Sequence, residues 1–137
     1  MNILNIAATK KSPRVLFEPS KKLFEIKGNS RPENVRDFYY PIIESLRSYF
    51  DTLADEQKLI AESEDDPFKF NFKLDYFNSS SAKFISDILV IVKDFYEKGI
   101  QFKVYWYFED GDDDMKEVGE DFSDMISFPF NYIMVQR

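Results

Sequence analysis

Two neighbouring segments in the middle of the chain have hydrophobic residues at opposite spacings. In residues 68–77, phenylalanine, leucine and tyrosine alternate with polar residues, which is the period of a β-strand with one buried face. In residues 84–95, hydrophobic residues recur every three or four positions, which is typical of one face of a helix. The polar stretch of residues 78–83 joins them. The pattern therefore predicts a strand that passes directly into a helix over residues 80–98.

The N-terminal segment has the pattern of a β-hairpin. Residues 15–17 and 23–26 are apolar and flank a loop that contains Pro19, a combination that favours two antiparallel strands. Residues 1–10 are mildly apolar, and we expect a short strand there at the edge of the sheet. Gly28 and Asn29 are predicted to end the second strand of the hairpin.

A long helix is predicted to follow the hairpin. Ser30 and Glu33 have the spacing of a capping box, and hydrophobic residues then recur at helical spacing as far as residue 53. Pro41 lies inside this pattern, and we expect a bend there because proline removes a backbone hydrogen bond. Residues 54–67 are rich in acidic side chains and are predicted to form a solvated connector with a possible helical extension.

The C-terminal part continues the alternation of strands and helices. Residues 100–108 and 128–135 have strand patterns, and residues 115–126 have a helical pattern. Strand–helix–strand units favour parallel pairing, and polar residues at alternate strand positions indicate that helices cover one face alone. The chain is therefore predicted to be one α/β domain, residues 1–137, built as a two-layer sandwich whose mixed sheet of about five strands has helices on one face.

Composition excludes several classes of function. The 137 residues carry a net charge of −7 and contain neither Cys nor His. The negative charge argues against nucleic acid and anionic membranes as partners. The missing residue types exclude disulfides, thiolate metal sites and Ser-His-Asp chemistry. Because the first residues also lack the pattern of a signal peptide and no stretch is long enough to span a membrane, we expect a cytoplasmic protein without cofactors.

An acidic loop, Asp110–Asp114, offers an alternative function. Clustered carboxylates can bind Ca²⁺ or Mg²⁺, and a small metal-binding or carboxylate-based enzyme could use this loop. The spacing around Gly111 does not match an EF-hand. A solvated turn before a helix, or a docking surface for a basic partner, explains the same residues, and Asp113 and Asp114 suit the first turn of that helix.

The serines of residues 78–83 suggest a phosphorylation switch. Ser79, Ser80 and Ser81 lie where a strand becomes a helix, and a helix N-terminus stabilises a negative charge such as phosphate. An ordinary N-cap explains the same residue types. A nucleophile pair formed by one of these serines and Lys83 is a further hypothesis, but the sequence shows no obvious oxyanion hole to support it.

The polar positions of the two central strands carry lysines and tyrosines. These are Lys69, Lys73, Lys103, Tyr105 and Tyr107. Such a face can bind an anion or single-stranded nucleic acid, although the net charge argues against the latter. A solvated sheet face and a protein interface are the other interpretations.

Several motifs follow one another along nearly the whole chain. They are residues 28–34, 76–83, 104–107, the acidic loop that leads to residues 117–120, and residues 128–130. Together these motifs resemble the SiaC family of bacterial regulatory phosphoproteins.

This resemblance implies a STAS-like fold, as in anti-anti-sigma factors, and a non-enzymatic role in partner switching. A serine/threonine kinase and a PP2C-type phosphatase would modify the protein. The unphosphorylated form would activate a diguanylate cyclase, raise cyclic di-GMP and affect biofilm formation. The phosphosite carries over to Ser79, where the family usually has Thr, with Ser80 and Ser81 as alternatives. Partner contacts are expected at Asn78, Ser79, Ser80 and Lys83.

Overall fold

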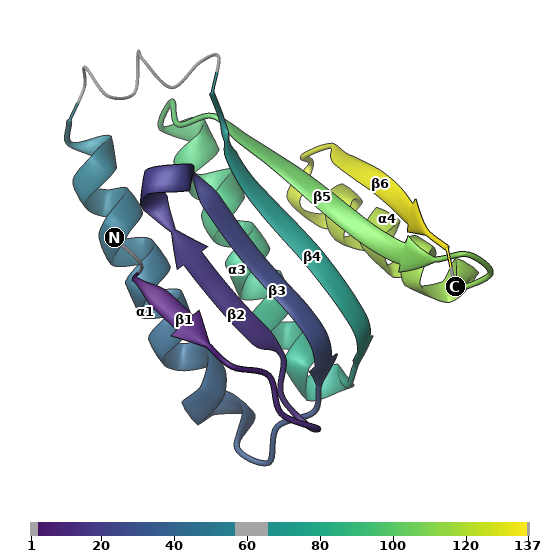
Figure 1. Cartoon of the computed structure of the whole chain (residues 1–137). Coiled ribbons are helices and arrows are strands. Elements are labelled where there is room, and N and C mark those ends of the chain that lie inside the picture. Colours follow the sequence, from purple (N-terminus) through teal and green to yellow (C-terminus); the bar gives the residue numbers. More distant parts are fainter. Residues whose placement is uncertain (1–2, 57–65, 137) are drawn as a thin grey trace.

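The computed structural model describes residues 3–56 and 66–136 (Figure 1). The elements in chain order are β1 (Leu4–Ile6), β2 (Arg14–Glu18), the 3₁₀ turn η1 (Pro19–Lys21), β3 (Leu23–Ser30), α1 (Val35–Ala54), β4 (Phe68–Phe77), α3 (Ser79–Glu97), β5 (Phe102–Glu109), α4 (Asp113–Ile126) and β6 (Phe130–Val135). The helical extension predicted for the acidic connector falls mainly on residues 57–65, which lie outside the described residues.

The strands form one mixed sheet in the order β1-β2-β3-β4-β5-β6. β1, β2 and β3 pair antiparallel, whereas β3 to β6 pair parallel. In Figure 1, α1, α3 and α4 all lie behind the sheet, and its front face is open. The predicted two-layer architecture is confirmed. The sheet has six strands rather than about five, because residues 4–6 form the short edge strand expected at the start of the chain.

Aromatic rings fill the space between the sheet and the helices. Phe50 on α1 lies at the centre of this core, with its ring centroid 5.0 Å from that of Phe68 and 5.2 Å from that of Phe102. Phe17 and Phe95 also pack against it. Such edge-on and tilted contacts are the favoured geometry of aromatic pairs. Because these rings come from α1, α3 and three strands, the core fixes how the helices sit on the sheet.

The predicted end of the hairpin at Gly28 and Asn29 is wrong. β3 continues to Ser30, and Gly28 has a φ of +116°, a conformation that glycine adopts without strain. The register between β3 and β4 shifts at this point, as in a β-bulge. The strand therefore continues through this glycine instead of ending there.

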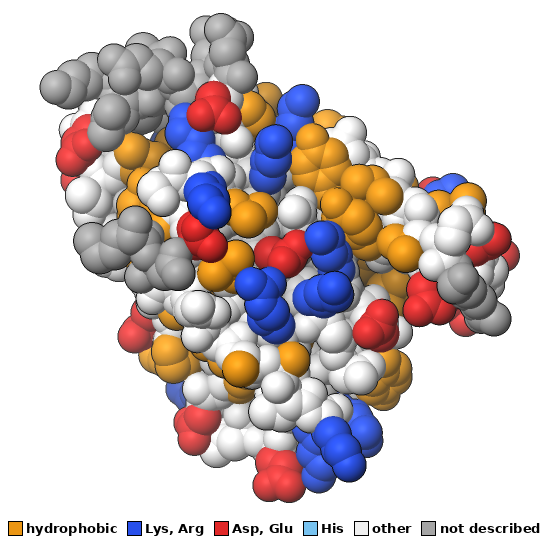
Figure 2. Space-filling view, in the orientation of Figure 1, with side chains coloured by type: hydrophobic (Ala, Val, Ile, Leu, Met, Phe, Trp, Pro, Cys, Tyr) orange, Lys and Arg blue, Asp and Glu red, His pale blue; other side chains and the backbone are white. Residues whose placement is uncertain are grey.

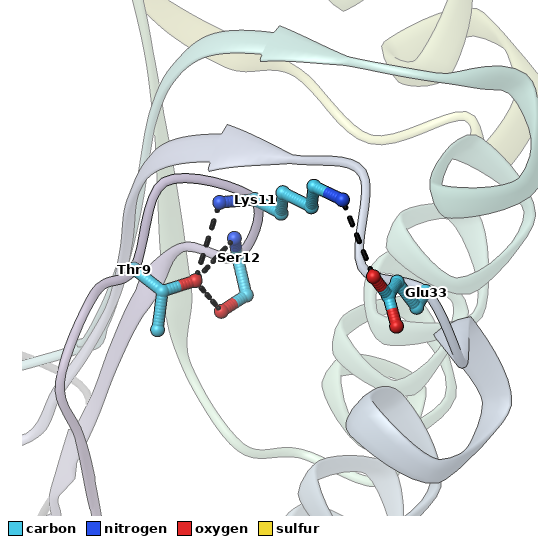
Figure 3. Close-up of polar contacts among 4 residues, drawn as sticks. All are labelled: Thr9, Lys11, Ser12 and Glu33. Atoms are coloured by element: carbon cyan, nitrogen blue, oxygen red, sulfur yellow. Dashed lines mark hydrogen bonds and ion pairs between the residues drawn. The ribbon is translucent and has the colours of Figure 1, made fainter.

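The predicted capping box at Ser30 and Glu33 is also wrong, because β3 continues to Ser30. Because Ser30 belongs to the strand, α1 begins later, and Asn34 caps it by accepting a hydrogen bond from the amide of Asp37. Glu33 pairs with Lys11 at 3.2 Å instead (Figure 3). The helix runs through Pro41 without interruption.

The bulge also reverses which side chains of β4 face the helices. Gly28 pairs with Leu74 and Asn29 pairs with Tyr76, so Asp75 is an additional residue in β4. Tyr76, predicted to face the core, is instead 50% exposed. Phe77 takes the inward position and packs against Trp106. This change of face brings the end of β4 into contact with the core just before α3 begins.

In the described part of the chain, no helix combines the length and apolar character that crossing a membrane requires.

Candidate functional site

Asn78 makes the transition from β4 to α3. Its backbone is extended, and its side-chain oxygen accepts a hydrogen bond of 2.9 Å from the amide of Ser81, which makes it the N-cap of α3. Its own amide donates to the carbonyl of Ser30 at 3.1 Å. The helix therefore begins at Ser79, one residue before the predicted start, and its first turn is tied to the end of β3. Residues 78–83 are called the serine turn below.

The three serines of this turn have different environments. Ser79 and Ser80 are exposed, whereas Ser81 is fully buried. The first amides of an α-helix have no partner within the helix. Asn78 satisfies that of Ser81, which leaves those of Ser79 and Ser80 for water or an anion at the positive end of the helix dipole. The geometry therefore offers two accessible hydroxyls beside a site that tolerates negative charge.

A chain of buried hydroxyl groups fixes the serine turn to the core. The hydroxyl of Ser81 donates to the carbonyl of Ser30 at 3.0 Å and accepts from the hydroxyl of Ser30 at 2.8 Å. The hydroxyl of Tyr39 contacts that of Ser30, and since the proton of Ser30 is already used, Tyr39 is the donor. All three residues are fully buried. These linked hydroxyl groups join α1, β3 and α3. None of the buried side-chain oxygens of Ser30, Tyr39 and Ser81 lacks a hydrogen-bond partner.

Burial raises the pKa of Tyr39 to about 12, although the neighbouring hydroxyls of Ser30 and Ser81 act to lower the pKa, because they can donate to the phenolate form. In the unfolded chain the pKa is near 10, so the native state holds this proton more tightly. The resulting stability is fully present below pH 10 and is lost as the pH rises toward 12.

Replacing Tyr39 by Phe tests this hydroxyl chain. We expect the variant to lose about 1 kcal/mol of stability at pH 7, because Ser30 loses a donor in a buried setting. Between pH 10 and 12 its stability should fall less steeply than that of the unmodified protein, since it lacks the titrating group. Urea unfolding across this pH range measures both effects. Equal pH slopes for the two proteins would contradict the assigned burial of the phenol.

Lys83 does not pair with the serine hydroxyls. Its ammonium group lies 2.9 Å from the carboxylate of Asp87 and above the ring of Phe84. It is exposed on the first turns of α3. No contact of the described residues therefore forms the Ser/Lys nucleophile pair, while Lys83 remains accessible to a partner.

The loops beside the serine turn meet at the same edge of the sheet. The amide of Arg31 donates to the carbonyl of Lys11 at 2.7 Å, so the loop before β2 contacts the end of β3. Figure 3 shows that the hydroxyl of Thr9 organises this loop, accepting from the amides of Lys11 and Ser12 at 3.2 and 3.0 Å. The serine turn thus sits among loops that are held by hydrogen bonds and an ion pair.

The acidic loop starts a helix. Asp112 caps α4 by accepting from the amide of Met115 at 3.0 Å, and Asp113 and Asp114 occupy the first turn. α4 therefore begins before the predicted residue 115. Among residues 3–56 and 66–136, no group of three or more acidic side chains is arranged to hold a metal ion. Within these residues, the loop has the geometry of a helix start.

Ser30 and Tyr39 are the site residues that the sequence analysis missed. Ser81 lies four and seven positions before Ile85 and Ile88, so helical spacing already puts it on the buried face of α3. A serine on an apolar face needs a hydrogen-bond partner. That requirement was a usable signal, although the sequence does not say which residue supplies the partner.

Comparison with known proteins gives one consistent result. A sequence model of the SiaC family, described as regulatory phosphoproteins, matches residues 6–135. An uncharacterized protein of Pseudomonas aeruginosa strain UCBPP-PA14 is 26% identical over 130 residues, which cover 95% of this chain and 94% of that protein.

Solved structures share the fold. The crystal structure of apo-SiaC from Pseudomonas aeruginosa is 22% identical with a TM-score of 0.75, covering 97% of this chain and 98% of that one. A chain in the complex of the diguanylate cyclase SiaD with its activator SiaC, from the same organism, is 23% identical with a TM-score of 0.78, covering 96% and 99%.

Proposed function

This chain belongs to the SiaC family of regulatory phosphoproteins, and we propose that it is a non-enzymatic cytoplasmic regulator that is switched by phosphorylation of Ser79. In its unphosphorylated form it binds and activates an output partner. The similar SiaC structure is that of an activator bound to the diguanylate cyclase SiaD. We therefore propose a diguanylate cyclase as the partner here, with cyclic di-GMP and biofilm formation as the downstream output.

The observation that supports this proposal most directly is the unequal exposure of the three serines. Ser81 is buried and uses its hydroxyl both to donate and to accept, so a kinase would have to pull it from the core. Ser79 and Ser80 are exposed. Ser79 is the first residue of α3, the position at which a phosphate lies closest to the unpaired amides and the positive end of the helix.

Phosphorylation changes the charge of this surface without requiring a change of fold. A phosphate adds about 1.5 to 2 negative charges and three acceptor oxygens. The buried chain from Tyr39 to Ser81 and the cap at Asn78 hold the turn in place. A partner that packs against Ser79, Ser80 and Lys83 would then have to remove water from the phosphate, at a cost of several kcal/mol. An acidic partner surface would add repulsion.

Switching in both directions needs two further proteins, a serine/threonine kinase and a PP2C-type phosphatase. The exposed position of Ser79 suits both, because the kinase must reach its hydroxyl and the phosphatase must reach the phosphate on the same oxygen. The hydroxyl lies on a turn with β4 on one side and α3 on the other.

Phosphosite mapping tests the proposal. The protein is purified from its native cell, its intact mass is measured, and the modified residue is located by peptide fragmentation. We expect a single phosphate on Ser79 and its loss in the Ser79→Ala variant. Ser80→Ala serves as the matched control and should still be modified. A phosphate on Ser80 alone, or none under any growth condition, would overturn the assignment.

A further inference from the structure

Three basic side chains lie next to one another across the open face of the sheet. In the strand register, Arg14 on β2 is opposite Lys27 on β3, and Lys27 is opposite Lys73 on β4. Neighbouring strands are separated by about 4.8 Å. Like charges opposite each other on adjacent strands destabilise a sheet. The repulsion within this row therefore has to be compensated by acidic groups, either of this protein or of a partner.

One carboxylate compensates part of this charge. Glu25 lies 2.9 Å from the guanidinium of Arg14 and 2.7 Å from the ammonium of Lys73. Burial acts to raise the pKa of Glu25, but its hydrogen bonds and ion pairs with Lys73 and Arg14 outweigh this effect and leave the pKa below its ordinary value. Glu25 thus stays ionised near neutral pH and serves two cations. Lys27 lies between them and is exposed.

A second basic pair lies nearer the other end of the same strands. Lys69 on β4 is directly opposite Lys103 on β5, and both are exposed. In Figure 2, Lys and Arg side chains gather over the open face of the sheet, with a few acidic side chains between them. The whole chain has a net charge of −7, so this face is opposite in sign to the molecule. The lysine face is defined here as Arg14, Lys27, Lys69, Lys73 and Lys103.

The surface between the basic rows suits a protein more than a small anion. Tyr105 and Tyr107 lie half-buried on this face, and tyrosine is enriched in protein interfaces. Figure 2 also shows an apolar strip beside the basic groups. A shallow hollow of about 310 Å³ lies next to Tyr107, lined in part by Lys27 and Lys73 but also by two acidic residues, Asp75 and Glu109. The hollow therefore concentrates no positive charge for a small anion, whereas the two rows spread charge over a wide, flat area.

We propose that the lysine face is a docking surface for an acidic protein segment that lies across β3, β4 and β5. Aspartate and glutamate side chains of the segment would match the two basic rows, and an apolar side chain would enter the hollow beside Tyr107. The proposal goes beyond the phosphorylation switch, because the surface is made by strands and not by the serine turn. Such a regulator would bind an acidic protein segment on the open face of the sheet, while phosphorylation of the serine turn controls binding of the output partner.

A synthetic acidic peptide tests this surface in the full chain. The probe is a fluorescent helical peptide of about 20 residues with glutamates four positions apart, and the same peptide with glutamine in place of glutamate is the uncharged reference. We expect saturable binding of the acidic peptide that weakens at higher salt. The double variant Lys27→Gln and Lys69→Gln should weaken it at least about tenfold, since each row loses a charge that faces the peptide.

The matched control is Lys98→Gln with Lys116→Gln, which removes the same charge from exposed positions outside the lysine face. It should change the affinity less than about twofold. An equal loss in both double variants, or tighter binding of single-stranded DNA or phosphatidylserine vesicles than of the peptide, would overturn the proposal. Self-association in sedimentation that the Lys27 and Lys69 changes abolish would overturn it too, in favour of a second copy as occupant.

The test of the docking surface can fail or succeed independently of the test of the phosphorylation switch. Ser79→Asp should leave peptide binding unchanged, because Ser79 is outside the lysine face. If the lysine changes have no effect on peptide binding while Ser79→Asp still abolishes binding of the output partner, the docking surface is refuted and the switch stands.

Discussion

Replacing Ser79 by Asp is expected to weaken binding of the output partner by about a hundredfold or more, whereas Ser79→Ala should bind as tightly as the unmodified protein. A partner that covers the turn must take the new carboxylate out of water, and an unpaired charge in an interface costs several kcal/mol. Each 1.4 kcal/mol is a factor of ten in affinity. Calorimetric titration with the proposed partner, a diguanylate cyclase, measures the effect, and the activity of that enzyme gives a second readout.

Ser80→Asp is the matched control for this prediction. Ser80 is exposed like Ser79, but it points about 100° further round the helix. Ser80 is itself an expected partner contact, so the same charge there should also weaken binding, but by less than at Ser79, about tenfold or below. Equal affinities for Ser79→Ala and Ser79→Asp would contradict the switch. A larger loss from Ser80→Asp than from Ser79→Asp would move the switch to Ser80.

The segments that flank the site were predicted from the sequence with small errors. β4 runs from Phe68 to Phe77 as predicted, and α3 begins at Ser79 where residue 80 was expected. Both segments have strong periodicity and clear end signals, and Asn78 is a favoured N-cap residue. Periodicity also revealed that one face of the sheet is open, because the polar positions of β4 and β5 alternate with apolar ones.

The errors arose where distant residues decide the local structure. Ser30 and Glu33 match a capping box, yet Ser30 is used by β3, and its hydroxyl bonds to Ser81, 51 positions away. The bulge at Gly28 depends on pairing with β4 and reverses Tyr76 and Phe77. No local pattern contains this information, since it comes from the register of two strands that are far apart in the sequence.

The same limit applies to the candidate site. The sequence predicted a serine-rich turn, but three adjacent hydroxyls look equivalent as a string of letters. Their difference follows from the packing of α3, which buries Ser81 beside Tyr39 and leaves Ser79 and Ser80 exposed. Likewise, the lysine rows appear only when strand register aligns Arg14 with Lys27 and Lys69 with Lys103.

Gly119→Ala is expected to destabilise the fold by about 2 kcal/mol or more, although alanine is normally the better helix former by about 1 kcal/mol. Gly119 is buried on α4, and a Cβ there would lie 2.5 Å from the indole ring of Trp106. That ring cannot move aside easily. It is 1% exposed, it stacks on Phe72, and its Nε1 donates to the carbonyl of Met115 on the same helix at 2.9 Å. Chemical denaturation measures the change.

Whether Gly119→Ala stabilises or destabilises the fold identifies the cause. The higher helix propensity of alanine favours stabilisation, whereas a clash with Trp106 favours destabilisation. In a Trp106→Leu background the indole is absent, so Gly119→Ala should become neutral or stabilising by up to about 1 kcal/mol, whatever the leucine change itself costs. Glu120→Ala, at the next and exposed position of α4, should stay within about 0.5 kcal/mol of the unmodified protein. The same penalty for Gly119→Ala in both backgrounds would contradict this explanation, because the clash with the indole of Trp106 would then not be what excludes a Cβ at position 119.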